Sequence, residues 1–564
     1  MSRRLRNLDS LWLGAPALAA VAIGVLLPMG VLVVYSLWPT VDQEVVHQWT
    51  LENYWRFFQG REYWQTLLKT FLFVGIASAL TVMVTFPFAY YVALRVRPAR
   101  RVAWVVLAVL PFFTSYLIRV LVWMNLLGDE GVLNDALLRS GLVDQPLGIL
   151  GDNKSGIVIT FVYLLFPLAF LTTYVVIERM NPALLDAGAD LGATPRQRLM
   201  RITLPIARTG LLAGFIFCFI AMLGDYVTPL LIGGTEGYLY SNLITNQFGS
   251  SVQWGFGSAL ALILMVAIFG LLLSIRRVTG AAAEVGAYTR SFTPARSPGL
   301  RAYSLLFLVY LYAPIALLVL LAFNSRSTIG LPITGLTLDW FRQAAQDPLL
   351  VDSLRNSLQV ATTAVGISTL VGTPAAVYLA RRRGRVRDAT LLTLALPMFL
   401  PPMLLGLAII IGLDALGLSR GMWTIILGHI ILTIPIVTML VLVRLEGLDQ
   451  NLELAAMDLG ASPAVALVRI SAPQAVPGII AAGLISFALS MDEFILTSLV
   501  TGSDSTLPLY IFGQLRFSIT PAVVAVSALL LLASGLLLVA GALIATIGRR
   551  EGNRSAAEFA GVMS

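Results

Sequence analysis

The chain has 564 residues, of which 58% are hydrophobic and only 12% are charged, and its mean hydropathy is +0.85. Soluble globular chains carry charge on roughly a quarter of their residues. Half of that charge leaves too little polar surface to coat a body of this length, so the composition excludes a soluble globular protein. The net charge of +8 comes mainly from arginine residues that sit between apolar runs, which excludes a nucleic-acid-binding patch.

The apolar runs predict about twelve transmembrane helices, because several of them reach the roughly 20 residues that cross a bilayer as a helix. The expected fold class is therefore an all-α, polytopic membrane protein embedded in the lipid bilayer. We place the spans at residues 12–36, 66–94, 103–127, 155–178, 209–233, 254–275, 303–323, 353–380, 389–414, 422–443, 474–500 and 519–547.

Arginine clusters fix the expected orientation. Loops rich in arginine between apolar runs lie on the cytoplasmic side, and two such loops occur at residues 95–101 and 381–387. An even number of spans puts both termini on one side. The terminal arginines predict that this side is the cytoplasm, with the first span kept as an uncleaved anchor (Arg3, Arg4 and Arg6; Arg549, Arg550 and Arg554).

Cysteine and histidine give no sign of a disulfide framework or a metal site. Cys218 is the only cysteine and lies in an apolar run. His47 and His429 are far apart in the sequence, whereas a metal site needs clustered ligands. We therefore expect no metal in this chain.

The chain consists of two halves that repeat. A polar segment, residues 276–302, divides it and reads as a cytoplasmic linker. On either side, residues 190–195 (Asp-Leu-Gly-Ala-Thr-Pro) match residues 458–463 (Asp-Leu-Gly-Ala-Ser-Pro), an offset of 268. Six spans in each half keep the repeat parallel, unlike the inverted repeats of many secondary transporters. Two similar bodies side by side predict a pathway between them.

The repeated segment predicts an elbow of two short helices on the cytoplasmic surface. We expect a first helix over 182–191, ended by Gly192 in the left-handed conformation. Thr194 is then the N-cap and Pro195 the first residue of a second helix, which we expect to stop at Pro205. The second half repeats this pattern around Gly460, Ser462 and Pro463.

This segment resembles the cytoplasmic loop of binding-protein-dependent importer permeases of the ATP-binding-cassette (ABC) class. The family motif is Glu-Ala-Ala followed by Gly, Ile and Leu-Pro. The first copy has Asp186-Ala187-Gly188, Gly192, Ile202 and Leu204-Pro205, and the second has Leu454-Ala455-Ala456, Gly460, Ile470 and Ala472-Pro473. Leu454 stands where the family has Glu, so the second copy is expected to dock its partner by apolar contact alone.

The resemblance implies the type I ABC importer permease fold, in which each elbow is a coupling helix that docks on an ATPase. The implied partners are an ABC ATPase homodimer at the cytoplasmic face and an extracytoplasmic solute-binding protein, at the bacterial inner membrane. The only lysines, Lys69 and Lys154, lack the preceding glycine of a P-loop. We therefore expect a permease rather than an enzyme, with no cofactor of its own, and with ATP and Mg bound by the partner.

The expected domain boundaries follow from the spans and the resemblance. Two transmembrane domains are placed at 66–275 and 353–547. Residues 1–65 precede the first domain and residues 303–352 precede the second, and each of these ranges is expected to hold a single helix with an extracytoplasmic segment. Residues 276–302 are the expected linker and residues 548–564 the expected tail.

Acidic residues occur at matching places in the fifth span of each half. Asp225 precedes Tyr226, and the offset of 268 brings it onto Glu493 in the stretch Asp492-Glu493-Phe494. Carboxylates inside a span usually face a cavity or a partner. Two interpretations stay open. In the first, acidic and aromatic side chains line a cation pathway, and Tyr116 and Trp123 add cation–π contacts (Asp225, Tyr226, Asp492, Glu493 and Phe494). In the second, Arg119 pairs with Asp225 or Glu493 and has a purely structural role. We also expect residues 224–229 to kink the helix.

A finer resemblance concerns the cargo. The first half is similar to the first permease subunit of polyamine (spermidine/putrescine) importers, through residues 131–134, 224–229 and 231–234. The second half is similar to the second subunit, through residues 490–494 and 507–509. The resemblance implies a fused polyamine permease. The alternatives are a ferric-iron ABC permease, an ion-gradient-driven secondary transporter, and a membrane scaffold that transports nothing.

Overall fold

The computed structural model describes residues 11–128, 131–148, 153–234, 237–279, 297–326, 333–517, 521–533 and 535–536. The terminal arginines that predicted the orientation and most of the predicted linker lie outside these residues. The described part is almost entirely helical, with one two-residue hairpin near the N-terminus (β1, Thr40–Val41; β2, Glu44–Val45). The expected all-α class is confirmed.

The first half contains the helices α1 to α15, with short 3-10 and π-helical turns labelled η. In chain order they are α1 (Leu11–Val21), η1 (Ala22–Leu26), α2 (Leu27–Ser36), α3 (Glu52–Gln59), α4 (Arg61–Leu94), α5 (Pro98–Val109), η2 (Leu110–Phe113), α6 (Tyr116–Leu127), α7 (Val132–Arg139), α9 (Asn153–Glu178), α10 (Ala183–Asp190), α11 (Pro195–Arg198), η3 (Leu199–Thr203), α12 (Leu204–Gly224), α13 (Val227–Ile232), α14 (Tyr240–Phe248) and α15 (Trp254–Thr279).

The second half contains α16 to α26. They are α16 (Pro298–Ala322), α17 (Asp339–Gln346), α18 (Pro348–Arg381), α19 (Arg385–Ala395), η4 (Leu396–Phe399), α20 (Pro402–Ala415), α21 (Met422–Glu446), α22 (Gln450–Asp458), α23 (Pro463–Ala466), η5 (Leu467–Ser471), α24 (Ala472–Asp492), α25 (Ile495–Val500) and α26 (Leu507–Phe517). A further apolar helix covers Pro521–Ala533, and residues 537–547 of the predicted twelfth span lie outside the described residues.

Nine described helices are long and apolar enough to span a membrane, and the number is eleven if each of two bent pairs is one span. The bent pairs replace the predicted straight spans 103–127 and 389–414. One bends by 82° before α6 and the other by 97° before α20. Each bend follows a 3-10 turn with proline in its first positions, at Pro111 and Pro397, which is where the regular helical pattern is interrupted.

The two halves exchange their first helices. The helix α1 packs against α18 of the second half, and α2 packs against both α20 of the second half and α15 of the first, whereas α16 packs against α4 and α6 of the first half. The buried cores follow the same exchange. Ala17 and Val21 of α1 belong to a core made by the second half, and Phe307 and Leu311 of α16 belong to the core of the first half. Each half is therefore completed by a helix of the other.

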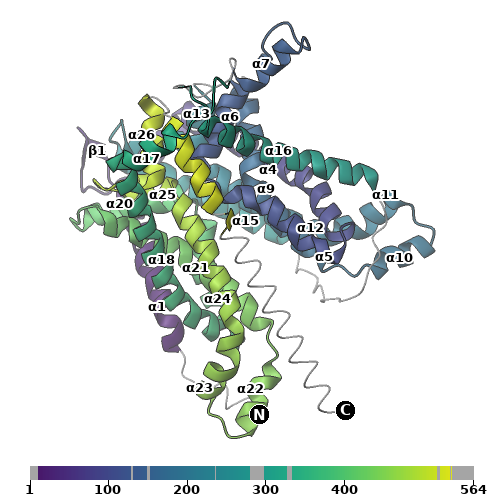
Figure 1. Ribbon diagram of the computed structural model, residues 1–564. Helices are drawn as coiled ribbons and strands as arrows, with labels where there is room; N and C mark the ends of the chain where they lie inside the picture. Colours follow the sequence, from purple (N-terminus) through teal and green to yellow (C-terminus); the bar gives the residue numbers. More distant parts are fainter. Residues whose placement is uncertain are drawn as a thin grey trace.

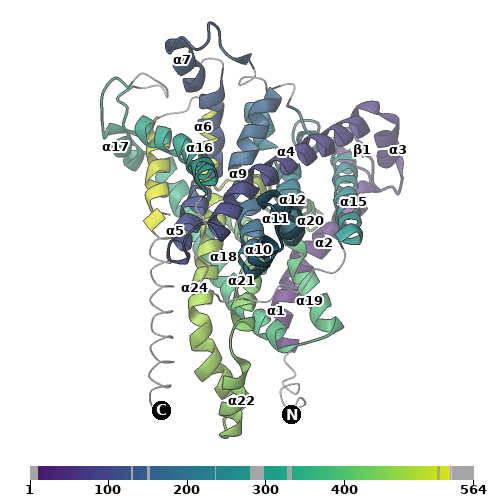
Figure 2. The same cartoon turned by 90° about the vertical axis from the view of Figure 1, so that its right-hand side faces the viewer.

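Figure 1 shows the two predicted elbows, α10–α11 and α22–α23, at the ends of separate helix bundles. In both views α7 lies at the opposite end of the molecule from α22 (Figures 1 and 2). The elbow α22–α23 therefore lies at the end of the protein opposite α7, whereas α10–α11 lies at the side of the molecule in Figure 1 and near the middle of the view in Figure 2.

The structure corrects one expectation about the elbows: the second short helix does not stop at Pro205. Residues 195–224 form one continuous helix of 30 residues. The five-residue π turn η3 ends at Thr203, two positions before Pro205, and its equivalent η5 ends at Ser471, two positions before Pro473. A π turn already interrupts the regular ladder of hydrogen bonds, so the N–H that proline lacks falls where the pattern is broken anyway. The elbow is thus joined rigidly to the span that follows it.

Close packing of α12 on α9 generates the first prediction. A Cβ at Gly210 would lie 2.6 Å from the carbonyl oxygen of Thr172, which is backbone and cannot move aside. We expect Gly210→Val to destabilise the protein by about 1–3 kcal/mol, as overpacking usually does. The measurement is the midpoint of thermal unfolding of the detergent-solubilised protein.

Gly270→Val is the matched control, because a Cβ at Gly270 of α15 meets no atom within 4 Å. The two substitutions make the same chemical change in the middle of a helix. Equal unfolding midpoints for the two variants would contradict the packing argument.

Candidate functional site

The first elbow has the predicted turn. Gly192 adopts a φ of +77°, and the side-chain oxygen of Thr194 accepts a hydrogen bond from the N–H of Gln197 at 3.3 Å. Gln197 returns the bond, because its Oε1 accepts from the N–H of Thr194 at 2.8 Å. This capping box fixes the start of α11. Beside the glycine, Leu191 is 88% exposed, so the bend presents an apolar side chain to the surroundings.

The second elbow repeats the geometry with different residues. Gly460 has a φ of +93°, and Ser462 Oγ accepts from the N–H of Val465 at 3.3 Å. Leu459 is 91% exposed, at the position that corresponds to Leu191. A large apolar side chain left in water at the same place in both halves is typical of a docking surface.

The other predicted coupling residues divide between the outer and inner faces of the elbows. Asp186, Ala187 and Ala455 are exposed, as are both prolines of the motif, Pro205 and Pro473. Gly188 is buried, and a Cβ there would lie 2.8 Å from Ile202 Cδ1, whereas its counterpart Ala456 is half-buried. The small residues of the motif therefore let the first helix of each elbow lie close against the following helix.

Sequence reasoning missed Glu453, one residue before the motif position held by Leu454. This carboxylate lies in the first turn of α22 and contacts Arg381, at the end of α18. The charge of α22 is therefore displaced by one residue and turned towards the body of the protein. The available signal was the neighbouring acid itself, together with an arginine that we had assigned only to membrane orientation.

A second candidate site lies where the fifth span of each half is broken. The helix α12 ends at Gly224 and α13 begins at Val227, as the predicted kink required. In the second half α24 ends at Asp492 and α25 begins at Ile495. A broken helix exposes free N–H groups, and inside a membrane only the protein can satisfy them.

Asp225 caps the short helix α13. Its Oδ1 accepts hydrogen bonds from the N–H groups of Val227 at 2.8 Å and Thr228 at 2.9 Å. Its Oδ2 accepts from the hydroxyls of Thr228 at 2.6 Å and Tyr116 at 2.7 Å. A carboxylate has about four acceptor positions, so the hydrogen bonds of the protein itself use the capacity of this buried group.

Glu493 occupies the same place in the second half but keeps more of its capacity. Its Oε1 accepts from the N–H of Leu496 at 2.7 Å and so caps α25. The side chain of Glu493 is half-buried, in contrast to the buried Asp225. The two symmetric acids share a structural task, and Glu493 has the greater freedom to contact a cation.

Asp492 joins the two halves. It accepts a hydrogen bond from the backbone N–H of Tyr116 at 2.5 Å and one from Arg119 Nη2 at 3.2 Å. Arg119 is 4% exposed, and its guanidinium lies 5.5 Å from the centre of the Phe112 ring. One of the two open interpretations paired Arg119 with Asp225 or Glu493. The structure assigns it to Asp492 because Asp492 lies at the start of α6, the helix that carries Arg119.

The symmetry-related contact contains no charge. Gly224 corresponds to Asp492, and Pro401 and Pro402 correspond to the residues at the start of α6. A Cβ on Gly224 would lie 2.5 Å from Pro401 Cβ. Pro402 has no N–H to satisfy at the start of α20, whereas Tyr116 does. An acid therefore stands at Asp492, where the neighbouring helix α6 begins with a free N–H group, and not at Gly224, where the neighbouring helix α20 begins with proline.

A cavity of about 190 Å³ lies at this junction. Both halves contribute to its wall, with Tyr116, Arg119 and Asp225 from the first and Asp492, Glu493 and Phe494 from the second. The rest of the lining is mainly apolar. Cavities that hold a drug-sized ligand measure about 300–1,000 Å³, so the passage is narrow in this conformation.

The predicted aromatic residues do not all face the cavity. Tyr226 exchanges a hydrogen bond with Ser498 at 2.7 Å, which links α13 to α25 across the two halves. Phe494 is buried against Phe512, with 4.7 Å between ring centres. Trp123 is buried with its ring centre 5.5 Å from that of Tyr163, and it does not belong to the lining of the cavity. Tyr116 and Phe494 therefore line the cavity, and Tyr226 and Trp123 are packed beside it.

His429 is a second residue that sequence reasoning passed over. Its Nδ1 lies 2.6 Å from Ser490 Oγ and its Nε2 2.8 Å from Thr497 Oγ1, so the ring spans the break between α24 and α25. Phe161 stands at the corresponding position of the first half. Within the described residues no group of three or more histidine, cysteine or acidic side chains could hold a metal ion.

The capping role of Asp225 generates the second prediction. We expect Asp225→Asn to lower the thermal stability of the purified protein, because an amide nitrogen would replace an oxygen that accepts two hydrogen bonds. Each buried donor left without an acceptor costs about 1–3 kcal/mol. Asp135→Asn is the control, since Asp135 forms an exposed ion pair with Arg139 on α7. Equal unfolding midpoints for the two variants would refute the structural role.

Comparison with known proteins places these features in a family. Residues 85–277 and 372–550 both match the family described as the binding-protein-dependent transport system inner membrane component. Over 217 residues the chain is 35% identical to the spermidine/putrescine transport system permease protein PotB of Haemophilus influenzae, which covers 38% of this chain and 75% of that protein.

The chain is also 34% identical over 237 residues to the spermidine/putrescine transport system permease protein PotC of Escherichia coli K12, which covers 42% of this chain and 89% of that protein. A solved bacterial alginate ABC transporter, in complex with an alginate pentasaccharide-bound periplasmic protein, matches with 18% identity and a TM-score of 0.37 over 42% of this chain and 85% of that chain. From the family match over both halves, this chain belongs to the inner membrane components of binding-protein-dependent transport systems.

Proposed function

We propose that the chain is the permease of an ATP-driven importer, with both membrane halves in one polypeptide, and that its cargo is a polyamine such as spermidine or putrescine. The observation that carries the proposal is the pair of elbows, each with a left-handed glycine and an exposed leucine. The cargo follows from the names of the two relatives, PotB and PotC. Neither relative is described as an iron permease, and the ferric-iron alternative has no support.

The proposed engine is an ABC ATPase dimer at the face formed by the elbows. Leu191 and Leu459 would each enter a groove of one ATPase subunit, and that partner would bind ATP and Mg. The continuous helix from Pro195 to Gly224 supports this arrangement, because a movement of the elbow reaches the break at Asp225 without passing through a loop. The same connection runs from Pro463 to Asp492 in the second half.

The proposed pathway runs through the cavity between the halves. Three carboxylates and one guanidinium leave an excess of negative charge there, which favours a polyamine cation. Glu493 is the acid with spare acceptor capacity and is our candidate for direct contact with the cargo. The ion pair between Arg119 and Asp492 links the halves on one side of the cavity, so opening the pathway between them would require this pair to separate.

The proposed orientation puts the elbows and both termini in the cytoplasm of a bacterial cell. The opposite end, which carries α7, would then face the extracytoplasmic solute-binding protein. We also propose the predicted transmembrane domains, 66–275 and 353–547, and the overlap with the family matches at 85–277 and 372–550 supports them.

The elbow geometry generates the third prediction. We expect the double variant Gly192→Val and Gly460→Val to insert normally but to lose most ATP-driven spermidine uptake. Both glycines have positive φ and open space around them, so the valines strain the backbone without causing a clash. The strain is about 1–2 kcal/mol for each residue. The measurement is uptake of labelled spermidine by proteoliposomes that contain the protein, its ATPase and its binding protein.

Gly141→Val provides the control for that experiment. Gly141 also has a positive φ, of +70°, and open space around it, but it follows α7 at the other end of the molecule. Uptake should therefore be nearly normal in this variant. Unchanged uptake in the double elbow variant would count against coupling through the elbows.

The free capacity of Glu493 generates the fourth prediction. Glu493→Gln keeps an oxygen to cap α25 but removes the charge, so we expect weaker spermidine transport with a small change in stability. Loss of one charged hydrogen bond, worth about 1.5–3 kcal/mol, corresponds to about a tenfold or greater rise in the KM for uptake. Asp352→Asn, an exposed acid on α18, is the control. Identical uptake kinetics in both variants would show that Glu493 is purely structural.

A further inference from the structure

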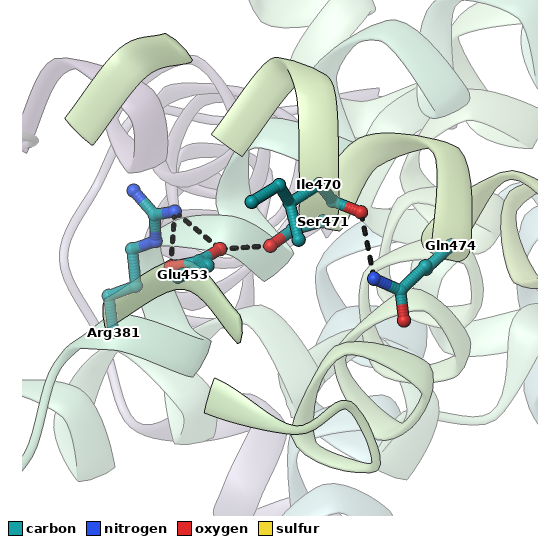
Figure 3. Close-up of polar contacts among 5 residues, drawn as sticks. All are labelled: Arg381, Glu453, Ile470, Ser471 and Gln474. Carbon is teal, nitrogen blue, oxygen red and sulfur yellow. Dashed lines mark hydrogen bonds and ion pairs between the residues drawn. The ribbon is translucent and has the colours of Figure 1, made fainter. Parts of the chain in front are cut away.

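The elbow of the second half is tied to a transmembrane helix by a cluster of polar side chains, which Figure 3 shows. Arg381 Nη2 donates to both carboxylate oxygens of Glu453, at 2.9 and 3.1 Å. The hydroxyl of Ser471 donates to Oε1 of the same carboxylate. We call these three residues the polar latch. Three different segments therefore meet at one carboxylate.

The position of each residue gives the latch its meaning. Arg381 is the last residue of α18, Glu453 lies in the first turn of α22, and Ser471 is the last residue of η5. The side chains of Arg381 and Glu453 are only 17% and 19% exposed. Removing one partner of an ion pair that is shielded from water in this way is strongly destabilising, because the other charge stays buried without a partner. Most ion pairs on a protein surface contribute little to stability.

The first half has an apolar joint at the same place. The helices α4 and α18 each have 34 residues and end at corresponding positions, so Leu94 matches Arg381. The offset of 268 matches Leu185 with Glu453 and Thr203 with Ser471. All three first-half residues are buried, and the hydroxyl of Thr203 has no hydrogen-bond partner among the described residues.

The first elbow is instead braced on itself. Arg198 Nη1 donates to the backbone carbonyl of Leu185 at 3.4 Å, a contact between α11 and α10. Ala466 stands at the position of Arg198 in the second half, so this brace has no counterpart there. The two elbows therefore use their arginines differently: one arginine joins the parts of an elbow, and the other joins an elbow to a span.

We propose, on the basis of the permease function above, that the polar latch transmits movement of the second elbow directly to α18 and that Glu453 is the positioning residue of this connection. Apolar contacts are non-directional and allow sliding. A carboxylate held by a guanidinium and a hydroxyl resists both separation and rotation. The ATPase would therefore drive the second half through a stiffer joint than the first.

The path beyond the latch supports this role. α18 packs along α21 and α24, and α24 leads to Asp492 and Glu493 at the cavity. At the other end of α18, the residue before it, Asp347, accepts a hydrogen bond from Tyr510 at 2.6 Å. A displacement of α18 therefore reaches both the cavity and the far end of the second half.

The test compares transport with ATP hydrolysis in the same proteoliposomes, using the full chain with its ATPase and binding protein. We expect Glu453→Leu and Arg381→Leu each to lower the amount of spermidine taken up per ATP hydrolysed by about tenfold, because one charge loses its buried partner. Hydrolysis itself should continue, since Leu459 and the docking face of the elbow are unchanged.

The double variant Arg381→Leu and Glu453→Leu recreates the pair found in the first half. We expect its uptake per ATP to be about threefold higher than that of the single variants and about threefold lower than that of the natural protein. The two sites are in contact, so the effects of the two substitutions are not additive. Glu446→Gln is the charge-matched control. Glu446 pairs with Arg387 at 2.5 Å in the same cytoplasmic region, but this pair does not involve the elbow.

Three outcomes would overturn the proposal. One is an unchanged ratio of uptake to hydrolysis in the single variants. Another is a parallel loss of both activities, which would assign these residues to docking or folding. The third outcome applies if the single variants are too unstable to reconstitute: the double variant then shows the same ratio of uptake to hydrolysis as the natural protein. Absence of ATP-driven uptake by the natural protein is a separate result and would refute the proposed function itself.

Discussion

The free N–H groups at broken helices are the constraint on which this structure depends. Within a membrane no water can satisfy them, and every break in a helix needs acceptors from the protein. Asp225 and Glu493 provide them at α13 and α25, and Asp492 provides one at α6. The charges that suit a cation pathway are thus the same groups that permit helices to begin there. The proposed transport role therefore falls on carboxylates that the fold itself already needs.

The repeat is informative chiefly where it fails. The backbone is duplicated closely, down to the π turns η3 and η5 before the prolines. The chemistry differs at two joints. At the cavity, Asp492 with Arg119 corresponds to Gly224 with a proline pair. At the elbows, Glu453 with Arg381 corresponds to Leu185 with Leu94. In both cases the second half contributes an acid where the first half has an uncharged residue, so the two halves are shaped alike but connected differently.

The sequence predicted the class, the parallel repeat and the elbows because these depend on local rules. Run length gave most of the spans but not the two bent ones, and the residues around Gly192 and Gly460 gave the turns. It failed where distant segments decide the outcome. Nothing in the local sequence says that Arg119 meets Asp492 rather than Asp225, or that Glu453 reaches Arg381. The prediction that the second short helix stops at Pro205 was wrong for a related reason. The π turn allows the helix to continue past the proline, and the sequence patterns that indicate helices do not indicate a π turn.

The exchange of first helices has a consequence for biogenesis. Ala17, Val21 and Val25 are fully buried, but the helices that cover them begin about 330 to 400 residues later in the chain, at Pro348, Pro402 and Met422. At a synthesis rate of about 5–20 residues per second, α1 spends on the order of tens of seconds in the lipid before its partners emerge. The lipid tolerates these apolar side chains, whereas water would not. When the second half arrives, the covalent connection keeps it close at hand, so the last step of assembly is a search within one molecule rather than between two.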